Sequence, residues 1–577
     1  MHIQTDRSNV LVLGAGGAGL RAAIAARESG ADVVVVGKRG RRDAHTVIAA
    51  GGINAALGTR DPEDSWEQHF ADTFREGYLL SHPRVVEIMA REAPEAVLQL
   101  ADWGCAFARL PDGRLDQRYF GAHTYRRTCY AGDETGREII RTLADWAEAA
   151  GVRFADRHYA SSLLVADGRC FGAFVFDLHT AERTAFLADA TIVCTGGHTS
   201  LWHRNTSRAD ENWGEGMSLA LRAGCRLMDM EFVQFHPTGL VAPEDVAGTL
   251  VTEAVRGEGG RLFNSRGERF MERYDPARME LSTRDRVALA NYTEILAGRG
   301  GPNGGVFLDI SHRGSDYIRE KLPRMYKQLL AFQGLDISKD PMEVAPTAHY
   351  SMGGIAVEPE THATDLERLF AAGECASGLH GANRLGGNSL VDILVFGRRA
   401  GAAAAGLREA RPVDPPPGVI EAASADLDGL AKPGKGSGRE IRRRLRELMW
   451  EKAGVVRDEV RLSAGLGELK ELRSSFEEAG PEGNDRLALA RTLDLRAGLE
   501  TAEATFRAAL VRAETRGCHN RSDHPGLDQT LVANSYVRRA PDGSLEVETR
   551  PVPPIPQGLR TWAVTELVEE TSEHLLE

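Results

Sequence analysis

The sequence predicts an α/β protein whose N-terminal part is a Rossmann-like, dinucleotide-binding domain. Two observations predict it. A strand, a glycine-rich turn, a helix and a second strand follow one another near the N-terminus, and two later apolar runs also end beside glycines. Units of this kind assemble into parallel sheets with helices on their faces. With 577 residues, the chain has room for roughly three to four domains.

The N-terminal unit begins with an apolar run over residues 9–13, which is typical of a buried parallel strand. Residues 20–29 carry alanines at helical spacing, and Gly30 begins the break that ends this helix. Residues 33–36 form a second apolar strand. The order strand, turn, helix, strand predicts a βαβ unit.

The turn inside this unit satisfies the pattern G-x-G-x-x-G. Glycines there permit the tight turn, the approach of backbone N–H groups to a pyrophosphate, and close packing of helix on strand. We therefore expect a dinucleotide at Gly14, Ala15, Gly16, Gly17, Ala18 and Gly19. The second strand ends at Gly37 and Lys38 without the acid that usually holds an NAD ribose. This departure disfavours a plain NAD site and leaves the nucleotide open at this point.

Two later apolar runs are predicted to be buried strands. Residues 190–194 are followed by Thr195 and Gly196, and residues 369–372 are followed by Gly373 and Glu374. Both strands therefore end beside small residues, as the first strand does.

The C-terminal part has a different composition. Residues 411–438 contain three consecutive prolines (415–417) and the run KPGKG (432–436), and they are predicted to be a linker. Residues 439–452 and 487–514 are rich in Ala, Leu, Glu and Arg, which predicts amphipathic helices.

The composition excludes several classes of protein. The net charge of −13, without a long basic block, argues against a nucleic-acid partner and against anionic membranes. The sequence contains no run of about 18 apolar residues, so it predicts no membrane span. The polar N-terminus predicts a cytoplasmic protein. Seven scattered cysteines without a C-x-x-C pair predict buried thiols, with no zinc or iron–sulfur ligand set and no metal site.

Residues 44–53 (AHTVIAAGGI) resemble the covalent flavin attachment segment of succinate dehydrogenase and fumarate reductase flavoprotein subunits. Further blocks resemble the same family and occur in its order. They are residues 235–239 (FHPTG), 252–260 (TEAVRGEGG), 349–354 (HYSMGG), 380–390 (HGANRLGGNSL) and 512–517 (RAETRG).

The resemblance implies a domain plan. A discontinuous, Rossmann-like FAD-binding domain would cover residues 1–239 and 349–410, and an inserted α+β capping domain over residues 240–348 would close over the substrate as a lid. A linker over 411–438, a C-terminal helical domain over 439–540 and an extension over 541–577 would follow. Closure of such a lid excludes water from the reacting groups.

The resemblance also implies FAD as the cofactor, bound covalently through His45 to the 8-methyl carbon of the flavin. Such a bond raises the flavin potential and favours oxidation of succinate. Glu374 resembles the acid that holds the ribose, and Ser389 and Leu390 begin a helix whose N-terminus would face the flavin pyrimidine. Further cofactor contacts are expected from Lys38, Thr46, Gly51, Gly52, Thr195, Gly196 and Glu215. Glu215 stands where the family usually has Asp, so its contact is the least regular.

The implied substrates are succinate and fumarate. His349 and Arg384 resemble the residues that bind one carboxylate, and His236 and Thr252 resemble those that bind the other. A guanidinium such as Arg384 offers the bidentate geometry that carboxylates favour.

Arg284, in the segment Thr-Arg-Asp, resembles the family's acid/base residue, with Asp285 expected to position it. Because a guanidinium is a poor base in water, its use requires a relay, and Glu253 and Arg256 resemble that relay. The alternative is that Glu253, Arg256 and Arg284 form a structural ion-pair cluster.

The leading hypothesis is a flavoprotein subunit that interconverts succinate and fumarate. Its electrons would pass to or from an iron–sulfur subunit and quinone, and membrane-anchor subunits would hold the complex at the inner face of the cell membrane. One alternative is an L-aspartate oxidase, which resembles the chain in the TEAVRGEGG block but binds FAD without the histidine link. Another is a non-catalytic FAD-binding scaffold. The physiological direction and the quinone type stay open.

Overall fold

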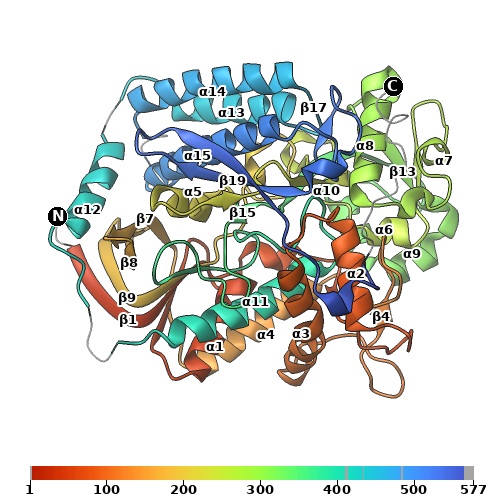
Figure 1. The fold of residues 1–577 in the computed structure, drawn as a ribbon. Helices are drawn as coiled ribbons and strands as arrows, with labels where there is room; N and C mark the ends of the chain where they lie inside the picture. The colour runs from red at the N-terminus through yellow and green to blue at the C-terminus, as the bar shows by residue number, and fades with distance from the viewer. Residues whose placement is uncertain (1–2, 410–412, 433, 482–484, 564–577) are drawn as a thin grey trace.

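A mostly parallel sheet of seven strands carries the glycine turn at the end of β1 (Ile3–Leu13) (Figure 1). The computed structural model describes residues 3–409, 413–432, 434–481 and 485–563, and the sheet is counted within them. The strand order is β6-β2-β1-β9-β8-β7, with β16 paired to β9. The remaining strands are β2 (Val33–Gly37), β6 (Arg153–Asp156), β7 (His158–Ala166), β8 (Arg169–Asp177), β9 (Arg183–Val193) and β16 (Leu369–Ala371).

The predicted βαβ unit is present, with α1 (Gly17–Glu28) between β1 and β2, and β1 pairs in parallel with both β2 and β9. Strand β1 starts at Ile3, earlier than the apolar run predicts. Its polar first half pairs with β9 from Arg183 onward. Tertiary pairing therefore extends the strand beyond the part that hydrophobicity identifies.

Helix α1 packs along α11 (Asn388–Ala405), and the contact depends on small residues. A Cβ on Gly401 would lie 2.1 Å from the carbonyl oxygen of Ala22, so a side chain there would push the helices apart. Figure 1 shows α1, α11 and α4 on one side of the sheet. The other helices of this part are α2 (Trp66–Glu76), α3 (Pro83–Asp102), α4 (Thr135–Ala149) and α5 (Glu215–Arg222), and its short strands are β3 (Ile53–Asn54), β4 (Gln117–Arg118) and β5 (Thr128–Cys129).

The capping region, on the right of Figure 1, is built on an antiparallel sheet in the order β11-β14-β13-β12. Its strands are β11 (Val233–Leu240), β12 (Arg261–Phe263), β13 (Val306–Asp309) and β14 (Met342–Ser351), and its helices are α6 (Ala254–Gly257), α7 (Met271–Tyr274), α8 (Arg284–Glu294), α9 (Ser315–Lys321) and α10 (Pro323–Gln333). β11 and β14 pair with each other, so the predicted domain borders at residues 239 and 348 fall inside paired strands.

The C-terminal helices pack into a layer at the top of Figure 1. The two predicted helices are α13 (Gly438–Lys452) and α15 (Ala488–Val511), and α14 (Glu459–Glu478) contacts both. Leu445, Leu462 and Leu499 belong to the buried cluster between them. The fold class predicted from the sequence, a Rossmann-like α/β domain with an inserted capping region and a C-terminal helical region, is confirmed.

The predicted linker is only partly correct, because residues 411–438 contain a helix, α12 (Val419–Leu430). Gly418 at its start has a φ of +92°, and Ala423 and Leu427, four residues apart, bury one face against β7 and β8. Residues 411–412 and 433 of this segment lie outside the described residues. The prolines lie at the start of the segment, before Gly418. The residues after them have the apolar spacing of a helix, which the linker prediction did not take into account.

The predicted boundary at residue 540 is wrong. β19 (Ala533–Arg539) and β20 (Leu545–Pro551) form a hairpin across it. β19 also pairs with β10 (Leu227–Met228), which pairs in turn with β15 (Gly354–Ile355). The chain after α15 therefore returns to the first domain, where β19 pairs with β10 on the side that β15 does not occupy. Residues 564–577 of the predicted extension, like residues 1–2, lie outside the described residues.

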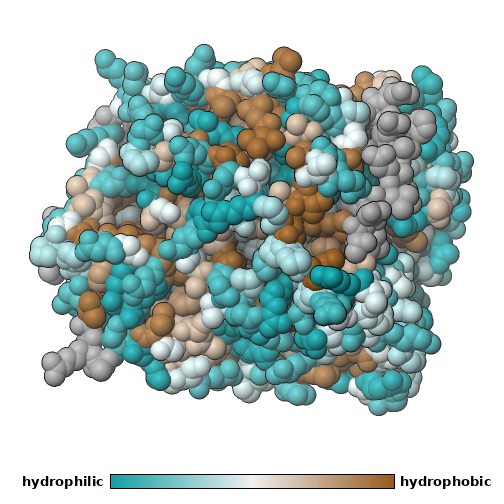
Figure 2. Space-filling model, in the orientation of Figure 1, coloured by the Kyte–Doolittle hydropathy of each residue, from teal (hydrophilic) through white to brown (hydrophobic). Residues whose placement is uncertain are grey.

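None of the helices in the described part of the chain is long and apolar enough to cross a membrane. On the face drawn in Figure 2, hydrophobic residues gather in patches between hydrophilic ones. All seven cysteines are buried and free, as their scattered spacing predicts. They act as small apolar core residues.

Candidate functional site

A cavity of about 1550 Å³ is lined jointly by the large sheet, the capping region and the helical layer. It brings together residues that the sequence places hundreds of positions apart. The predicted site residues that line it are Gly14, Ala15, Gly16, Gly17, Ala18, Lys38, His45, Thr46, Gly51, Gly52, Thr195, Gly196, Glu215, His236, Thr252, Glu253, Arg284, His349, Glu374, Arg384, Ser389 and Leu390. Gly19 and Arg256 do not line it.

The glycine turn has the geometry of a phosphate cradle. Gly14 has a φ of +114°, and a Cβ there would lie 2.1 Å from the carbonyl oxygen of Cys194. Gly16 caps α1 without a side-chain hydrogen bond, and nothing lies closer than 3.7 Å to a Cβ built on it. The N-terminus of α1 lines the cavity, where its N–H groups favour an anion. Gly19 has a packing role instead, since its Cβ would lie 1.9 Å from the carbonyl oxygen of Gly14.

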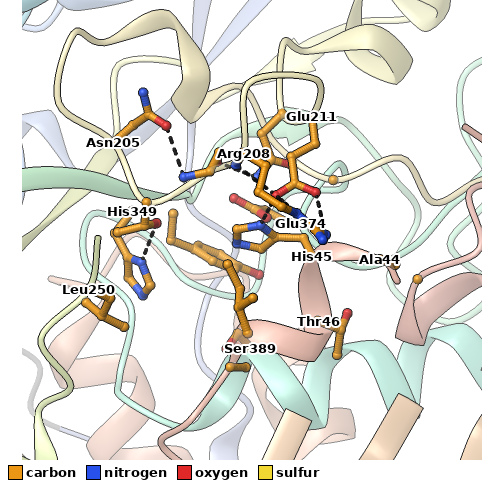
Figure 3. Close-up of a pocket in the computed structure, with 18 of the residues that line it drawn as sticks. Ala44, His45, Thr46, Asn205, Arg208, Glu211, Leu250, His349, Glu374 and Ser389 are labelled. Atoms are coloured by element: carbon orange, nitrogen blue, oxygen red, sulfur yellow. Dashed lines mark hydrogen bonds and ion pairs between the residues drawn. The ribbon is translucent and has the colours of Figure 1, made fainter. Parts of the chain in front are cut away.

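His45 starts a short 3-10 turn (His45–Ile48) after β2. Its Nδ1 lies 2.7 Å from Oε1 of Glu211, in the loop before α5 (Figure 3). Thr46 Oγ1 accepts a hydrogen bond from the backbone N–H of Gly17 at 3.3 Å, which joins the loop that carries His45 to the glycine turn. The segment around His45 and the phosphate cradle thus lie against each other in one cavity.

The acids predicted to contact the cofactor differ in their availability. Glu374 accepts one bond on Oε1, from the backbone N–H of Ser351 at 3.0 Å. Glu215 is paired with Lys38 at 2.9 Å, and Lys38 also meets Asp494 at 2.6 Å. Burial would lower the pKa of Lys38, but Asp494 and Glu215 outweigh it and raise that pKa. Lys38 and Glu215 are therefore held as an ion pair at the cavity wall.

Buried polar atoms mark where a ligand fits. Thr195 Oγ1 and Arg384 Nε are buried and have no hydrogen-bond partner among the described residues. Asn388 begins α11 directly behind Gly387, which has a φ of +86°, so Ser389 and Leu390 lie in the first turn as predicted. An unpartnered hydroxyl, an open glycine turn and two helix N-termini fit a ligand with phosphates and a polar ring.

The two predicted substrate histidines face each other, with ring centroids 5.2 Å apart. Burial, and then nearby arginines, lower the pKa of both His236 and His349 well below the usual value. Thr206 Oγ1 lies 2.9 Å from Nδ1 of His349, and Thr238 Oγ1 lies 3.3 Å from Nδ1 of His236. Both rings are neutral at pH 7, so each offers one N–H group and carries no charge.

Arg384 is a buried cation, 3% exposed, that no ion pair joins to a carboxylate of the described residues. It donates to Ser389 Oγ and to Gln234 Oε1, each at 2.9 Å, and it lies over the ring of Tyr350. Burial lowers the pKa of Arg384 to about 10, which leaves it charged at pH 7. A buried guanidinium with only neutral partners suits an anionic ligand.

Arg284, at the start of α8, pairs with Glu253 at 2.6 Å, and Arg256 lies 3.8 Å from the other oxygen of Glu253. Burial would raise the pKa of Glu253, but Arg284 and Arg256 outweigh it and lower that pKa to about 2. Arg256 lies behind this pair and donates to the carbonyl oxygen of Glu280 at 2.6 Å. The three residues form a chain that leads from the cavity into the capping region.

The expected role of Asp285 is wrong. Its two oxygens accept hydrogen bonds from Tyr78, at 2.6 Å, and from Asn383, at 2.9 Å. As the residue after Arg284 in a helix, Asp285 projects in a different direction from its neighbour. Arg284 is positioned by Glu253 and Gln234 instead.

Two residues of the site were missed in the sequence. Gln234 Oε1 accepts from both Arg284, at 3.1 Å, and Arg384, at 2.9 Å, and so holds the two guanidinium groups together. Its signal was its position two residues before His236 on one strand, which places both side chains on one face. No signal in the sequence indicated Glu211, because it is separated from its partner His45 by 166 positions along the chain.

Comparisons with known proteins agree along the chain. A family model described as FAD binding domain matches residues 9–390, and one described as fumarate reductase flavoprotein C-term matches residues 442–557. A fumarate reductase (CoM/CoB) subunit from Methanothermobacter marburgensis is 45% identical, over 91% of this chain and 96% of that protein. The succinate dehydrogenase flavoprotein subunit of Rickettsia conorii is 37% identical, over 96% of each.

The chain belongs to the succinate dehydrogenase and fumarate reductase flavoprotein subunit family. Solved structures extend the likeness to three dimensions. Mycobacterium smegmatis Sdh1 in complex with UQ1 is 40% identical with a TM-score of 0.87, over 96% of each chain. A quinol-fumarate reductase with menaquinol molecules is 35% identical with a TM-score of 0.90, over 96% of this chain and 99% of that one.

Family membership identifies the nucleotide for the glycine turn as FAD. The FAD-binding domain model spans both the turn and the segment around Glu374, so the chain is an FAD oxidoreductase of this family. The cradle at Gly14 and Gly16 and the unpartnered hydroxyl of Thr195 fit that cofactor.

Proposed function

We propose that this chain is the flavoprotein subunit of an enzyme that interconverts succinate and fumarate, with FAD bound covalently through His45. The observation that carries the proposal is Arg384, a buried guanidinium without a carboxylate partner in the described chain. It lines the same cavity as His45 and the glycine turn. A dicarboxylate would supply the missing negative charge beside the flavin.

The cavity offers donors for both ends of such a substrate. Arg384 and the neutral His349 would bind one carboxylate, and His236 and Thr252 would bind the other. Because the capping region contributes one wall, closure there would exclude water and strengthen these contacts. FAD, when bound, supplies the acceptor or donor of the hydride. The side chains named above would orient the substrate.

Arg284 would transfer the proton to or from the substrate carbon. Its guanidinium lines the cavity, and the ionised Glu253 beside it would return or remove the proton. Arg256 would continue the path away from the cavity. The alternative, that the three are only a structural ion-pair cluster, predicts no specific effect on turnover and is tested by replacing Arg284.

Replacing His45 with serine should abolish covalent attachment while FAD still binds non-covalently. Succinate oxidation should fall more than fumarate reduction, because a lower flavin potential opposes only the oxidation. The wild-type polypeptide should keep its flavin after acid denaturation, and a tryptic peptide that contains His45 should carry the mass of FAD. The exposed His179, replaced by serine, is the matched control. Wild-type protein that releases all its flavin would contradict the attachment and favour the oxidase alternative.

The electron partner is proposed to be an iron–sulfur subunit, with quinone beyond it and membrane-anchor subunits that hold the complex at the inner face of the cell membrane. The chain alone should oxidise succinate with small dyes but should not reduce quinone, and quinone activity should appear when a [2Fe–2S]-bearing protein is added. Efficient quinone reduction by the isolated chain would contradict this arrangement.

Three other outcomes of that assay are informative. The 45% identical relative is named a fumarate reductase (CoM/CoB) subunit. Fumarate reduction driven by CoM and CoB in the presence of the iron–sulfur subunit would therefore show that these, and not quinone, supply the electrons. Fast turnover with aspartate and oxygen would identify an L-aspartate oxidase. Bound FAD without any of these activities would identify a scaffold.

A further inference from the structure

The imidazole of His45 is held by a carboxylate that is itself fixed in place. Arg208 donates to Glu211 Oε1 from its backbone N–H, at 3.0 Å, and from Nε, at 3.1 Å, and it donates from Nη2 to Oε2 at 2.9 Å. Arg208 also reaches Asp43 Oδ1 at 2.8 Å, two residues before His45. Figure 3 shows Glu211 between Arg208 and His45. The carboxylate therefore cannot turn away without breaking several charged hydrogen bonds.

This arrangement decides which nitrogen of His45 is available. In a neutral imidazole, one ring nitrogen carries the proton and the other carries a free electron pair. An ionised carboxylate can accept a hydrogen bond but cannot donate one. Because Glu211 Oε1 lies 2.7 Å from Nδ1, Nδ1 is the nitrogen that carries the proton and donates it in this hydrogen bond. The electron pair is then on Nε2, on the opposite side of the ring.

We propose that Glu211 is the positioning residue for covalent attachment of the flavin to His45. It keeps Nε2 as the free nitrogen, orients the ring, and balances the positive charge that the imidazole gains when Nε2 forms a bond. The inference rests on the proposed attachment through His45 and assigns a role to a residue outside the attachment segment.

Atoms and electrons balance in the attachment step. A C–H bond of the 8-methyl group breaks, its proton leaves to solvent, and a bond forms between that carbon and Nε2. The imidazole keeps its Nδ1 proton and becomes a cation paired with Glu211. The two electrons of the broken C–H bond stay on the flavin ring, and a two-electron acceptor, fumarate or oxygen, removes them.

Charged groups around His45 set the pH at which Nε2 is free. Burial would lower the pKa of His45, but Glu211 outweighs it, Glu374 adds to that effect, Arg208 opposes it, and the result is a raised pKa. The uncharged ring of His349 also lines the cavity. A doubly protonated His45 has no free electron pair, so attachment should speed up as pH rises through this raised pKa.

Replacing Glu211 with glutamine keeps the shape of the side chain and removes its charge. We expect attachment per bound FAD to slow by about 10–100-fold, as when a metal-binding histidine loses the partner that orients it. The pH midpoint of attachment should also move down, because the group that raised it is neutral. The full chain is prepared under flavin limitation and incubated with FAD and fumarate across a pH series. Acid-stable flavin on the polypeptide is then measured over time.

Two further variants sharpen the test. Asp210→Asn makes the same change one residue earlier, at an acid that pairs with Arg39 on the surface, and should attach flavin at the wild-type rate. Glu211→Asp keeps the charge and should attach flavin faster than Glu211→Gln. Total bound FAD, measured in parallel, separates attachment from binding.

An unchanged rate and an unchanged pH midpoint in Glu211→Gln, beside a wild type that attaches flavin, would overturn the role of Glu211 and leave the attachment to His45 standing. A wild type that binds FAD without acid-stable flavin at any pH would overturn the attachment itself. A Glu211→Gln variant that loses only total FAD, with a normal rate per bound FAD, would also overturn the positioning role.

Discussion

Replacing Arg284 with alanine should lower the rate of succinate and fumarate interconversion by about 10²–10⁴-fold, the usual contribution of a positioned acid or base. Arg284 lines the cavity, and its guanidinium is fixed by Glu253 and Gln234. FAD content and dicarboxylate affinity should stay close to wild type, because Arg384 and the two histidines are untouched. Turnover with dyes in both directions, beside a binding titration with malonate, measures the two effects separately.

Arg273→Ala is a suitable control for this experiment. Arg273 lies in the same capping region, is about half exposed and pairs with Glu294 away from the cavity. It should leave turnover unchanged. Equal turnover of wild type and Arg284→Ala would show that another group transfers the proton, and would favour a structural role for the cluster of Glu253, Arg256 and Arg284.

Replacing Arg384 with alanine should weaken the binding of succinate, malonate and oxaloacetate alike by about 2–5 kcal/mol, the cost of leaving a charge unpaired in a closed site. All three ligands carry the carboxylate that Arg384 is proposed to bind. Arg384→Lys should recover only part of the affinity, because an ammonium group cannot reproduce two parallel N–H bonds. Titrations followed by the flavin absorbance give the dissociation constants.

The control for Arg384 is Arg398→Ala on α11. Arg398 pairs with Glu92 and Glu95 away from the cavity lining, so its loss should leave dicarboxylate affinity unchanged. If Arg384→Ala bound malonate as tightly as wild type, the proposed anion site would be wrong. A general loss of FAD would instead mean that the bond from Arg384 to Ser389 supports α11.

Much of the fold could be predicted because its signals are local. The strand that ends at Leu13, the glycine turn and the helix after it lie within consecutive residues, and Gly19 leaves room for the carbonyl oxygen of Gly14 in the same turn. The same holds for α13, whose buried residues Ile441, Leu445 and Leu448 recur at helical spacing. α15 is buried on all sides, so the predicted amphipathic pattern is wrong for that helix. The hairpin of β19 and β20 could not be placed in the same way, because β19 pairs with β10, about 300 positions earlier in the sequence.

The sequence by itself determined the residue types of the site. It predicted the glycine turn from its own pattern, and it predicted the attachment at His45, the histidines at 236 and 349 and the arginines at 284 and 384 because these lie in short blocks that resemble the family. Spacing also found the partners that lie close along the chain, such as Glu253 with Arg256.

Only the tertiary structure decided which of these groups hold one another. It paired His45 with Glu211, placed Gln234 between two arginines, and gave Asp285 to Tyr78 and Asn383 rather than to Arg284. The physical reason is that hydrogen bonds and ion pairs act over about 3 Å in space, whatever the separation along the chain. A shift of one residue along a helix or a loop points the side chain in another direction and gives it another hydrogen-bond partner. No local pattern in the sequence specifies that partner.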